Sequence, residues 1–351
     1  MKQVFKQLRR FLPLAFSLAV MVYLFGYRTD PVENWNTARS VKPSMLYIAL
    51  LLGLVSFVFQ AVRLKILVEV LGHKVSLTRM LIYTLVGQFY NSAIPGGSVG
   101  GDAIKALYLS NATGSKPQAF AAVLVDRLCG LFMLATLALL VLLPSINEPT
   151  MRQAAAVIIV FTGGATLAIV SMTSRRIRKL VPSGLSSRLP FHDTIRAFDE
   201  AMQIYRGHKK GLVMALLLSI LPQAGWIGMH VAIGQGIGIQ LIWTDYAVLI
   251  PVAGMVAALP ISFGGWGVGE AASVHFFGLR GIGKVEAQVL SLMGRLIQLV
   301  WALIGLPLSW ALPRPKDISA AVHGDAVLPD RQVEAAAKDE PGEDKALKPD
   351  T

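Results

Sequence analysis

The stretch GGSVGGDA, residues 96–103, interrupts an apolar region with four glycines and a carboxylate. A related stretch, GGWGVGEA, occupies residues 264–271, 168 positions further on. Both fit the pattern G-G-x-x-x-G-[D/E]-A. Without a gap, the same offset aligns KPQAFAAVLVDRLCGL (116–131) with KVEAQVLSLMGRLIQL (284–299), which gives ten identities over residues 96–131. The chain therefore contains an internal repeat.

The composition is typical of an integral membrane protein. Of the 351 residues, 54% are hydrophobic and only 15% are charged, whereas soluble domains carry roughly 25% charged residues. Several apolar segments approach the ~20 residues that a membrane-spanning helix needs. These segments lie near residues 11–27, 44–62, 79–95, 117–143, 153–173, 211–233, 245–262 and 285–312.

Basic residues predict the orientation of these segments, because they concentrate in cytoplasmic loops. The net charge is +12, and basic groups occur at the N-terminus, after residue 62 and most densely over residues 174–210. If residues 79–95 simply crossed the membrane, the densest group would reach the outside. The conflict disappears if residues 79–95 enter from the cytoplasm, break at GGSVGG and return as residues 102–113.

The predicted fold is an all-α polytopic membrane protein built as an inverted repeat. Its halves, residues 11–143 and 153–312, would together contain about six full crossings and two re-entrant helical hairpins, with cytoplasmic N- and C-termini. In secondary transporters, paired interrupted segments of this kind meet near the midplane and form the substrate site. Residues 1–312 would form the transmembrane domain, with a basic amphipathic cytoplasmic segment at 174–210. Residues 313–351 are expected to be a disordered cytoplasmic tail.

Charged residues at membrane depth cost roughly 2.5–3.5 kcal/mol each, and four of them stand out in this sequence. Asp102 precedes Arg127 by 25 positions, and Glu270 precedes Arg295 by the same distance. In one interpretation the arginines bind a lipid phosphate through their planar fork, and the acids hold them or alternate with substrate. In the other, each half contains only a fixed ion pair. The full set of candidate substrate-binding residues is Arg127, Arg295, Asp102, Glu270, Asn91 and Asp126.

The glycine blocks permit two interpretations. Small residues four positions apart allow close helix packing, and a broken half-helix can point its N-terminal amides at an anion. A nucleotide-binding loop is not indicated, because no Gly-Lys-Ser/Thr sequence follows. The candidate hairpin residues are Pro95, Gly96, Gly97, Gly100, Gly101, Pro260, Gly264, Gly265, Gly267 and Gly269. No catalytic motif, metal-ligand spacing or cofactor motif was identified.

The stretches NSAIPGGSVGGDAIKALYLS (91–110) and KPQAFAAVLVDRLCGL resemble the lysylphosphatidylglycerol synthase transmembrane family, also called flippase-like integral membrane proteins. LPISFGGWGVGEAA (259–272) fits the same family, and the resemblance covers about residues 1–312. It implies a bacterial inner-membrane protein that handles lipids or lipid-linked glycans. In two-part members, this region is thought to flip an aminoacylated phospholipid made by a C-terminal synthase domain. No such domain is expected after residue 312 of this sequence, so lysine transfer by this chain is not expected either.

The leading functional hypothesis is translocation of an anionic or phosphate-linked lipid across the bacterial inner membrane. The expected partners are a membrane phospholipid or lipid-linked substrate and possibly a separate synthase, with no nucleic acid and no cofactor. One alternative is a membrane-embedded transferase acting on a polyprenyl-linked or hopanoid substrate, in which Asp102, Asp126 and Glu270 supply acid/base or metal chemistry. Another is an accessory subunit that positions an enzyme. Because no catalytic motif was identified, a non-enzymatic role is expected.

Overall fold

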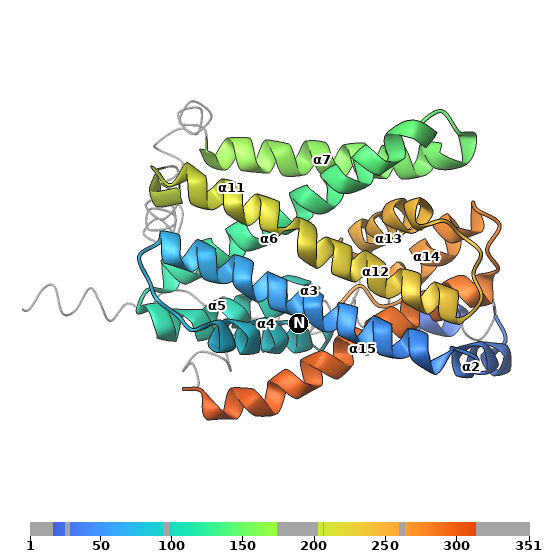
Figure 1. Ribbon diagram of the computed structural model, residues 1–351, viewed down its shortest axis with the longest axis horizontal. Coiled ribbons are helices and arrows are strands. Elements are labelled where there is room, and N and C mark those ends of the chain that lie inside the picture. Colours follow the sequence, from blue (N-terminus) through green and yellow to red (C-terminus); the bar gives the residue numbers. More distant parts are fainter. Residues whose placement is uncertain are drawn as a thin grey trace, which may run out of the picture.

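A computed structural model describes residues 17–24, 29–93, 98–173, 203–205, 207–259 and 264–313. These residues contain helices and no strand, which confirms the predicted all-α class (Figure 1). The helices are α2 (Pro31–Arg39), α3 (Pro43–Val70), α4 (Leu77–Ala93), α5 (Ser98–Thr113), α6 (Lys116–Leu142), α7 (Arg152–Thr173), α11 (Lys209–Leu218), α12 (Ile220–Gly236), α13 (Trp243–Ala257), α14 (Val268–Gly278) and α15 (Lys284–Leu308).

Some sequence predictions fall outside the described residues. They concern most of the first apolar segment, most of the basic segment 174–210 and nearly all of the tail 313–351. The same holds for four of the predicted hairpin residues, Pro95, Gly96, Gly97 and Pro260.

Within the described part of the chain, five helical spans are long and apolar enough to cross a membrane. They are Pro43–Val70, Lys116–Ser145, Pro149–Leu167, Lys209–Gly236 and Lys284–Ala311. These spans coincide with five of the six predicted crossings, so the chain is a multi-pass membrane protein. The remaining prediction, a crossing by residues 11–27, is not tested.

The span Lys209–Gly236 bends between α11 and α12. Pro222 lies in the first turn of α12 and has no N–H to donate, and its ring would clash with the carbonyl group of Leu218 in a continuous helix. Accordingly α11 ends at Leu218. Ser56 of α3 donates a 2.9 Å hydrogen bond to the carbonyl oxygen of Pro222. The bend thus lies directly against α3.

Two pairs of short helices form antiparallel hairpins at the glycine blocks. In the first, Gly101 N of α5 donates a 2.9 Å hydrogen bond to Asn91 Oδ1 of α4. In the second, formed by α13 and α14, the rings of Tyr246 and Phe277 pack edge to face with centroids 5.8 Å apart. All four helices contain 17 residues or fewer, which is shorter than the ~20 residues of a typical membrane-spanning helix. Their re-entrant placement in a bilayer stays a prediction.

The tips of the two hairpins meet. Gly264, in the turn before α14, has φ +56° and lies against the end of α4. A Cβ atom there would be only 2.7 Å from the carbonyl oxygen of Asn91. Both the left-handed backbone and this close approach favour glycine.

The repeat offset of 168 also relates the helices of the two halves. Shifted by this number, Pro43–Val70 falls on 211–238, and most of that range lies in α11 and α12. Lys116–Leu142 falls on 284–310, and most of that range lies in α15. The equivalent helices α3 and α12 pack side by side (Figure 1).

The contacts between α3 and α12 show that these helices run antiparallel. Gly225 lies against Leu52 and Ser56, whereas Gly236, further along α12, lies against Val41 near the start of α3. An antiparallel arrangement of equivalent helices is what an inverted repeat requires. The orientation of the halves and of the termini in a membrane stays a prediction.

Apart from the hairpin tips and the junction between α11 and α12, the interhelical connections that the structure describes gather at two opposite ends of the helical bundle (Figure 1). At one end, Arg280 forms ion pairs with Glu148 at 2.7 Å and with Asp245 at 2.8 Å. At the other, Asn111 Nδ2 donates a 3.3 Å hydrogen bond to the carbonyl oxygen of Pro313. The predicted topology places the first end outside the cell and the second in the cytoplasm.

Candidate functional site

A cavity of about 320 Å³ lies between the two halves of the molecule. Helices α3 to α6 contribute one part of its wall, and helices α12 to α15 contribute the other. Gly53 and Ser56, which line it, lie near the midpoint of α3, and Arg63 lies about 10 Å further along the helix axis. The cavity therefore occupies the middle of the membrane-spanning helices.

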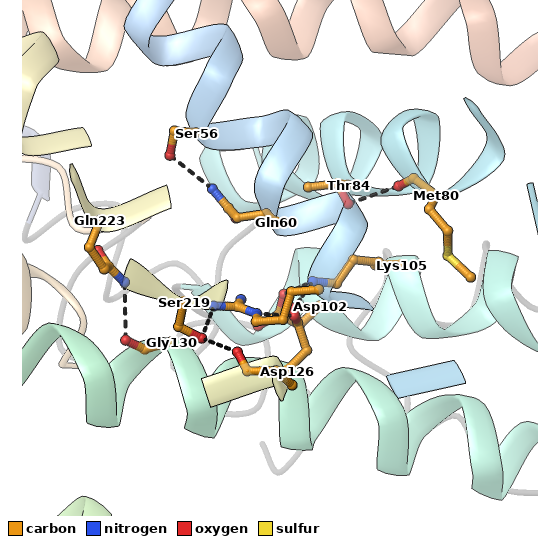
Figure 2. Close-up of polar contacts among 12 residues, drawn as sticks. Ser56, Gln60, Met80, Thr84, Asp102, Lys105, Asp126, Gly130, Ser219 and Gln223 are labelled. Carbon is orange, nitrogen blue, oxygen red and sulfur yellow. Dashed lines mark hydrogen bonds and ion pairs between the residues drawn. The ribbon is translucent and has the colours of Figure 1, made fainter. Parts of the chain in front are cut away.

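The first half supplies a continuous network of charged side chains (Figure 2). Arg63 Nε donates a 2.6 Å hydrogen bond to Asp126 Oδ1. Lys105 Nζ lies 3.2 Å from Asp126 Oδ2 and 3.4 Å from Asp102 Oδ1. Arg127 Nη1 lies 3.5 Å from Asp102 Oδ2. Three cations thus share two carboxylates, with all five side chains lining the cavity.

The inner members of this network are buried and paired. Arg63, Lys105 and Asp126 are between 3% and 7% exposed, and Arg63 Nη1 also donates a 3.0 Å hydrogen bond to Ser219 Oγ at the bend between α11 and α12. Taking these charges out of water is costly, and the mutual pairing offsets much of that cost. Asp126 is therefore the centre of the network.

Arg127 is the outermost member of the network. Its side chain is 33% exposed, and the ion pair with Asp102 is the longest of the four. A guanidinium group has five N–H donors in a planar fork. Arg127 consequently retains hydrogen-bonding capacity at the cavity surface.

The second half uses its arginine differently. Arg295 forms an ion pair with Glu270, which is fully buried. The same guanidinium group donates to the carbonyl oxygens of Gly264, at 3.1 Å, and Gly265, at 2.6 Å. It also lies 5.2 Å from the ring centroid of Trp266. Arg295 thus stabilises the turn of the second hairpin, and it also lines one side of the cavity.

Both predicted acid–arginine pairs are present, but they are not equivalent. The equal spacing in sequence suggested a duplicated pair with one role. Arg127 shares its carboxylate with Lys105, whereas Arg295 is held by Glu270 and the turn backbone. Whether these residues bind substrate stays a prediction.

Three of the predicted hairpin glycines, Gly101, Gly265 and Gly267, are required by the backbone. Gly265 and Gly267 have φ values of +77° and +79°. Gly101 approaches the carbonyl oxygen of Gly87 so closely that a Cβ atom would lie 1.9 Å from it. Gly267 N, at the start of α14, donates a 2.6 Å hydrogen bond to Glu270 Oε2. The anion-binding interpretation requires the backbone amides at the start of α14 to be available to a ligand. One of them, that of Gly267, already donates to the Glu270 carboxylate.

Sequence reasoning missed Arg63 and Lys105. The sequence predicts that the second apolar segment ends near residue 62 and that Arg63 follows it; this end is wrong, because α3 continues through Arg63 to Val70. Lys105 follows Asp102 by three residues, which is a neighbouring position on a helix and was an available signal. Asp126 is a predicted site residue to which the sequence assigned no partner, and in the structure it forms ion pairs with Arg63 and Lys105.

The comparisons with known proteins agree with this architecture. The family described as the lysylphosphatidylglycerol synthase TM region matches residues 10–305. The UPF0104 membrane protein PH1989 of Pyrococcus horikoshii is 22% identical over 277 residues, which cover 72% of this chain and 82% of that protein. Because the family match extends over most of the sequence, the chain belongs to the lysylphosphatidylglycerol synthase transmembrane-region family.

Proposed function

We propose that this protein moves an anionic, phosphate-linked lipid between the leaflets of the bacterial inner membrane. The observation that carries the proposal is an excess positive charge in an intramembrane cavity, with Arg127 partly exposed at its surface. The lipid headgroup would enter the cavity while its acyl chains remain in the bilayer.

The charge balance of the site favours one negative charge on the ligand. Its cations are Arg63, Lys105, Arg127 and Arg295, and its carboxylates are Asp102, Asp126 and Glu270, so the balance is 4 − 3 = +1. An uncompensated charge at membrane depth is costly. A phosphodiester would neutralise it, and the planar guanidinium fork of Arg127 suits bidentate contact with phosphate oxygens.

The position of the cavity also supports transport. It lies between two repeat halves and beside two paired hairpins whose tips touch at Asn91 and Gly264. In secondary transporters, sites between repeats become accessible to alternate sides by movement of one repeat against the other. Asp102 would hold Arg127 when the site is empty and release it when a phosphate arrives.

The transferase alternative has less support. A general acid or base must exchange a proton with substrate. Asp126, however, is 3% exposed and already bound by Arg63 and Lys105. Such pairing stabilises the ionised carboxylate and suits a fixed structural charge.

The test is reconstitution of the purified full chain into liposomes that contain a fluorescent phosphatidylglycerol. A membrane-impermeant quencher then reports how much of the probe has exchanged between leaflets. We expect exchange above that of empty vesicles, and a loss of at least about tenfold in Arg127→Gln, equivalent to one charged hydrogen bond. Lys65→Gln is the matched control, because Lys65 forms an exposed ion pair with Glu69 away from the cavity. Exchange no faster than in empty vesicles, across several anionic headgroups, would refute the proposal.

A further inference from the structure

We infer that α2 is an interfacial helix, and that its exposed apolar face lies among the phospholipid headgroups of the leaflet at its end of the molecule. No residue of α2 lines the cavity between the repeat halves, so this role is independent of the proposed function. Three observations carry it: the depth of α2, the side chains that α2 exposes and two basic groups beside them.

The depth of α2 follows from its contacts with α15. Asn34 Nδ2 donates a 2.8 Å hydrogen bond to Thr29 Oγ1, which in turn donates a 3.2 Å hydrogen bond to Gln288 Oε1. Gln288 lies four residues after the start of α15, about 6 Å along its axis. The 28-residue span Lys284–Ala311 is about 42 Å long, so its ends reach the headgroup layers of a bilayer. α2 therefore lies beside the end of a spanning helix, at headgroup level, and not beyond it.

α2 exposes two faces of different character. Val32 and Trp35, three positions apart on one face, are 65% and 63% exposed. Glu33 and Asn36, each one position further along, are exposed on a polar face. A helix with one apolar and one polar exposed face suits the boundary between lipid and water. Tryptophan is enriched at this boundary, because its large ring is apolar whereas its N–H group is polar.

α2 leads directly into the lipid-facing surface of α3. Only residues 40–42 separate the two helices. Tyr47 and Leu51, one turn apart near the start of α3, are 70% and 62% exposed on a membrane-spanning helix, so they face lipid. Trp243, at the start of α13, is 65% exposed at the same end of the bundle (Figure 1). Exposed aromatic residues at one level are typical of the interfacial belt of a membrane protein.

Two basic side chains give the surface around Trp35 a charge that matches lipid phosphates. Arg39 Cζ lies 5.9 Å from the ring centroid of Trp35, so its guanidinium group is beside that ring. Lys42 is exposed just before α3. Within the described part of the chain, neither Arg39 nor Lys42 forms an ion pair. Self-association of two copies through this surface would bring the same cations together and repel them, whereas phosphate groups attract them.

The test places spin labels at neighbouring positions of the full chain. In a Cys129→Ala background, Val32→Cys and Glu33→Cys are labelled with a nitroxide and reconstituted into liposomes of phosphatidylglycerol and phosphatidylcholine. Paramagnetic resonance then measures collisions of the label with oxygen, which concentrates in lipid, and with a water-soluble nickel chelate. Both positions are exposed in the structure, and Trp35 is retained in both variants. We expect oxygen to be the more effective agent at position 32 and the nickel chelate at position 33.

A charge substitution tests the contact with phosphate. Arg39→Gln, combined with Val32→Cys, should lower the ratio of oxygen to nickel accessibility at position 32, because α2 loses its attraction to the headgroups. Lys65→Gln is the matched control, since Lys65 is a partly exposed cation that pairs with Glu69 on α3, away from α2. An unchanged ratio in Arg39→Gln would overturn the contact between Arg39 and lipid phosphates.

Three results would overturn the interfacial position itself. A stronger effect of nickel at both positions would place α2 in water. A stronger effect of oxygen at both positions would place the whole helix in the hydrocarbon layer. Low accessibility of position 32 to both agents would show that protein, and not lipid, covers this face.

Discussion

Arg63 and Asp126 are 63 positions apart in the chain, yet Arg63 Nε donates a 2.6 Å hydrogen bond to Asp126 Oδ1 between two membrane-spanning helices. The bond joins α3 to α6, and Lys105 extends it to α5. One carboxylate therefore ties three helices of the first half together. Its removal would leave two buried cations without their shared partner.

The first prediction concerns this carboxylate. Asp126→Asn keeps the shape of the side chain and removes the charge that Arg63 and Lys105 share, so we expect the free energy of unfolding to fall by about 3–5 kcal/mol. Denaturant unfolding of the purified protein in detergent measures it. Glu69→Gln is the control, because its ion pair with Lys65 is exposed and should contribute no more than about 1 kcal/mol. Equal effects of the two substitutions would show that Asp126 does not organise the helices.

The second prediction separates the two arginines. Lysine keeps the charge of arginine but loses its planar fork. Arg295→Lys should therefore destabilise the protein by about 1–3 kcal/mol, because the carbonyl oxygens of Gly264 and Gly265 lose their donors.

The corresponding Arg127→Lys variant should unfold close to the wild type while it exchanges lipid more slowly. Thermal unfolding in detergent and exchange in liposomes measure the two effects on the same preparations. If both variants lose stability equally, Arg127 is a structural residue and the asymmetry between the pairs has no functional meaning.

Much of the fold was predictable from sequence, because the glycine blocks, the helix lengths and the charge pattern are local properties of the chain. The offset of 168 anticipated the correspondence of α6 with α15, and the apolar runs anticipated five spans. The predicted end of α3 near residue 62 is wrong, because the prediction ends the apolar run at its first arginine, Arg63. A buried ion pair allows a helix to continue through such a residue, and its partner lies far away in the sequence.

The asymmetry between the two arginines was not anticipated, although the sequence contains a signal for it. At the repeat offset, Lys105 corresponds to Ser273 and Asp126 to Gly294. The second half therefore lacks the additional charges of the first, so Glu270 has Arg295 as its own partner. The contacts of Arg295 with the turn carbonyls depend on the positive-φ conformations of Gly264 and Gly265, which motif spacing does not specify.

The third prediction tests the close packing of the first hairpin. In Gly101→Ala, the new Cβ atom would lie 1.9 Å from the backbone oxygen of Gly87, so α4 and α5 must separate. We expect a loss of about 1–3 kcal/mol in the free energy of unfolding. Gly163→Ala is the matched control: Gly163 lies in the interior of α7, and its Cβ atom would meet nothing within 4 Å. That substitution should stabilise the protein by up to about 1 kcal/mol. Similar changes in both variants would contradict the close approach of α4 and α5.

The fourth prediction tests the orientation of the molecule. Lys74 lies in the exposed connection between α3 and α4, and Asn147 lies in the exposed connection between α6 and α7, at the opposite end of the helices. In a Cys129→Ala background, Asn147→Cys should react with a membrane-impermeant thiol reagent in intact cells. Lys74→Cys should react only after the membrane is permeabilised, because basic loops remain in the cytoplasm. The unsubstituted protein is the control, since Cys129 is 3% exposed and should stay unlabelled. The reverse pattern would invert the predicted topology, and labelling of both positions in intact cells would exclude opposite membrane faces for the two connections.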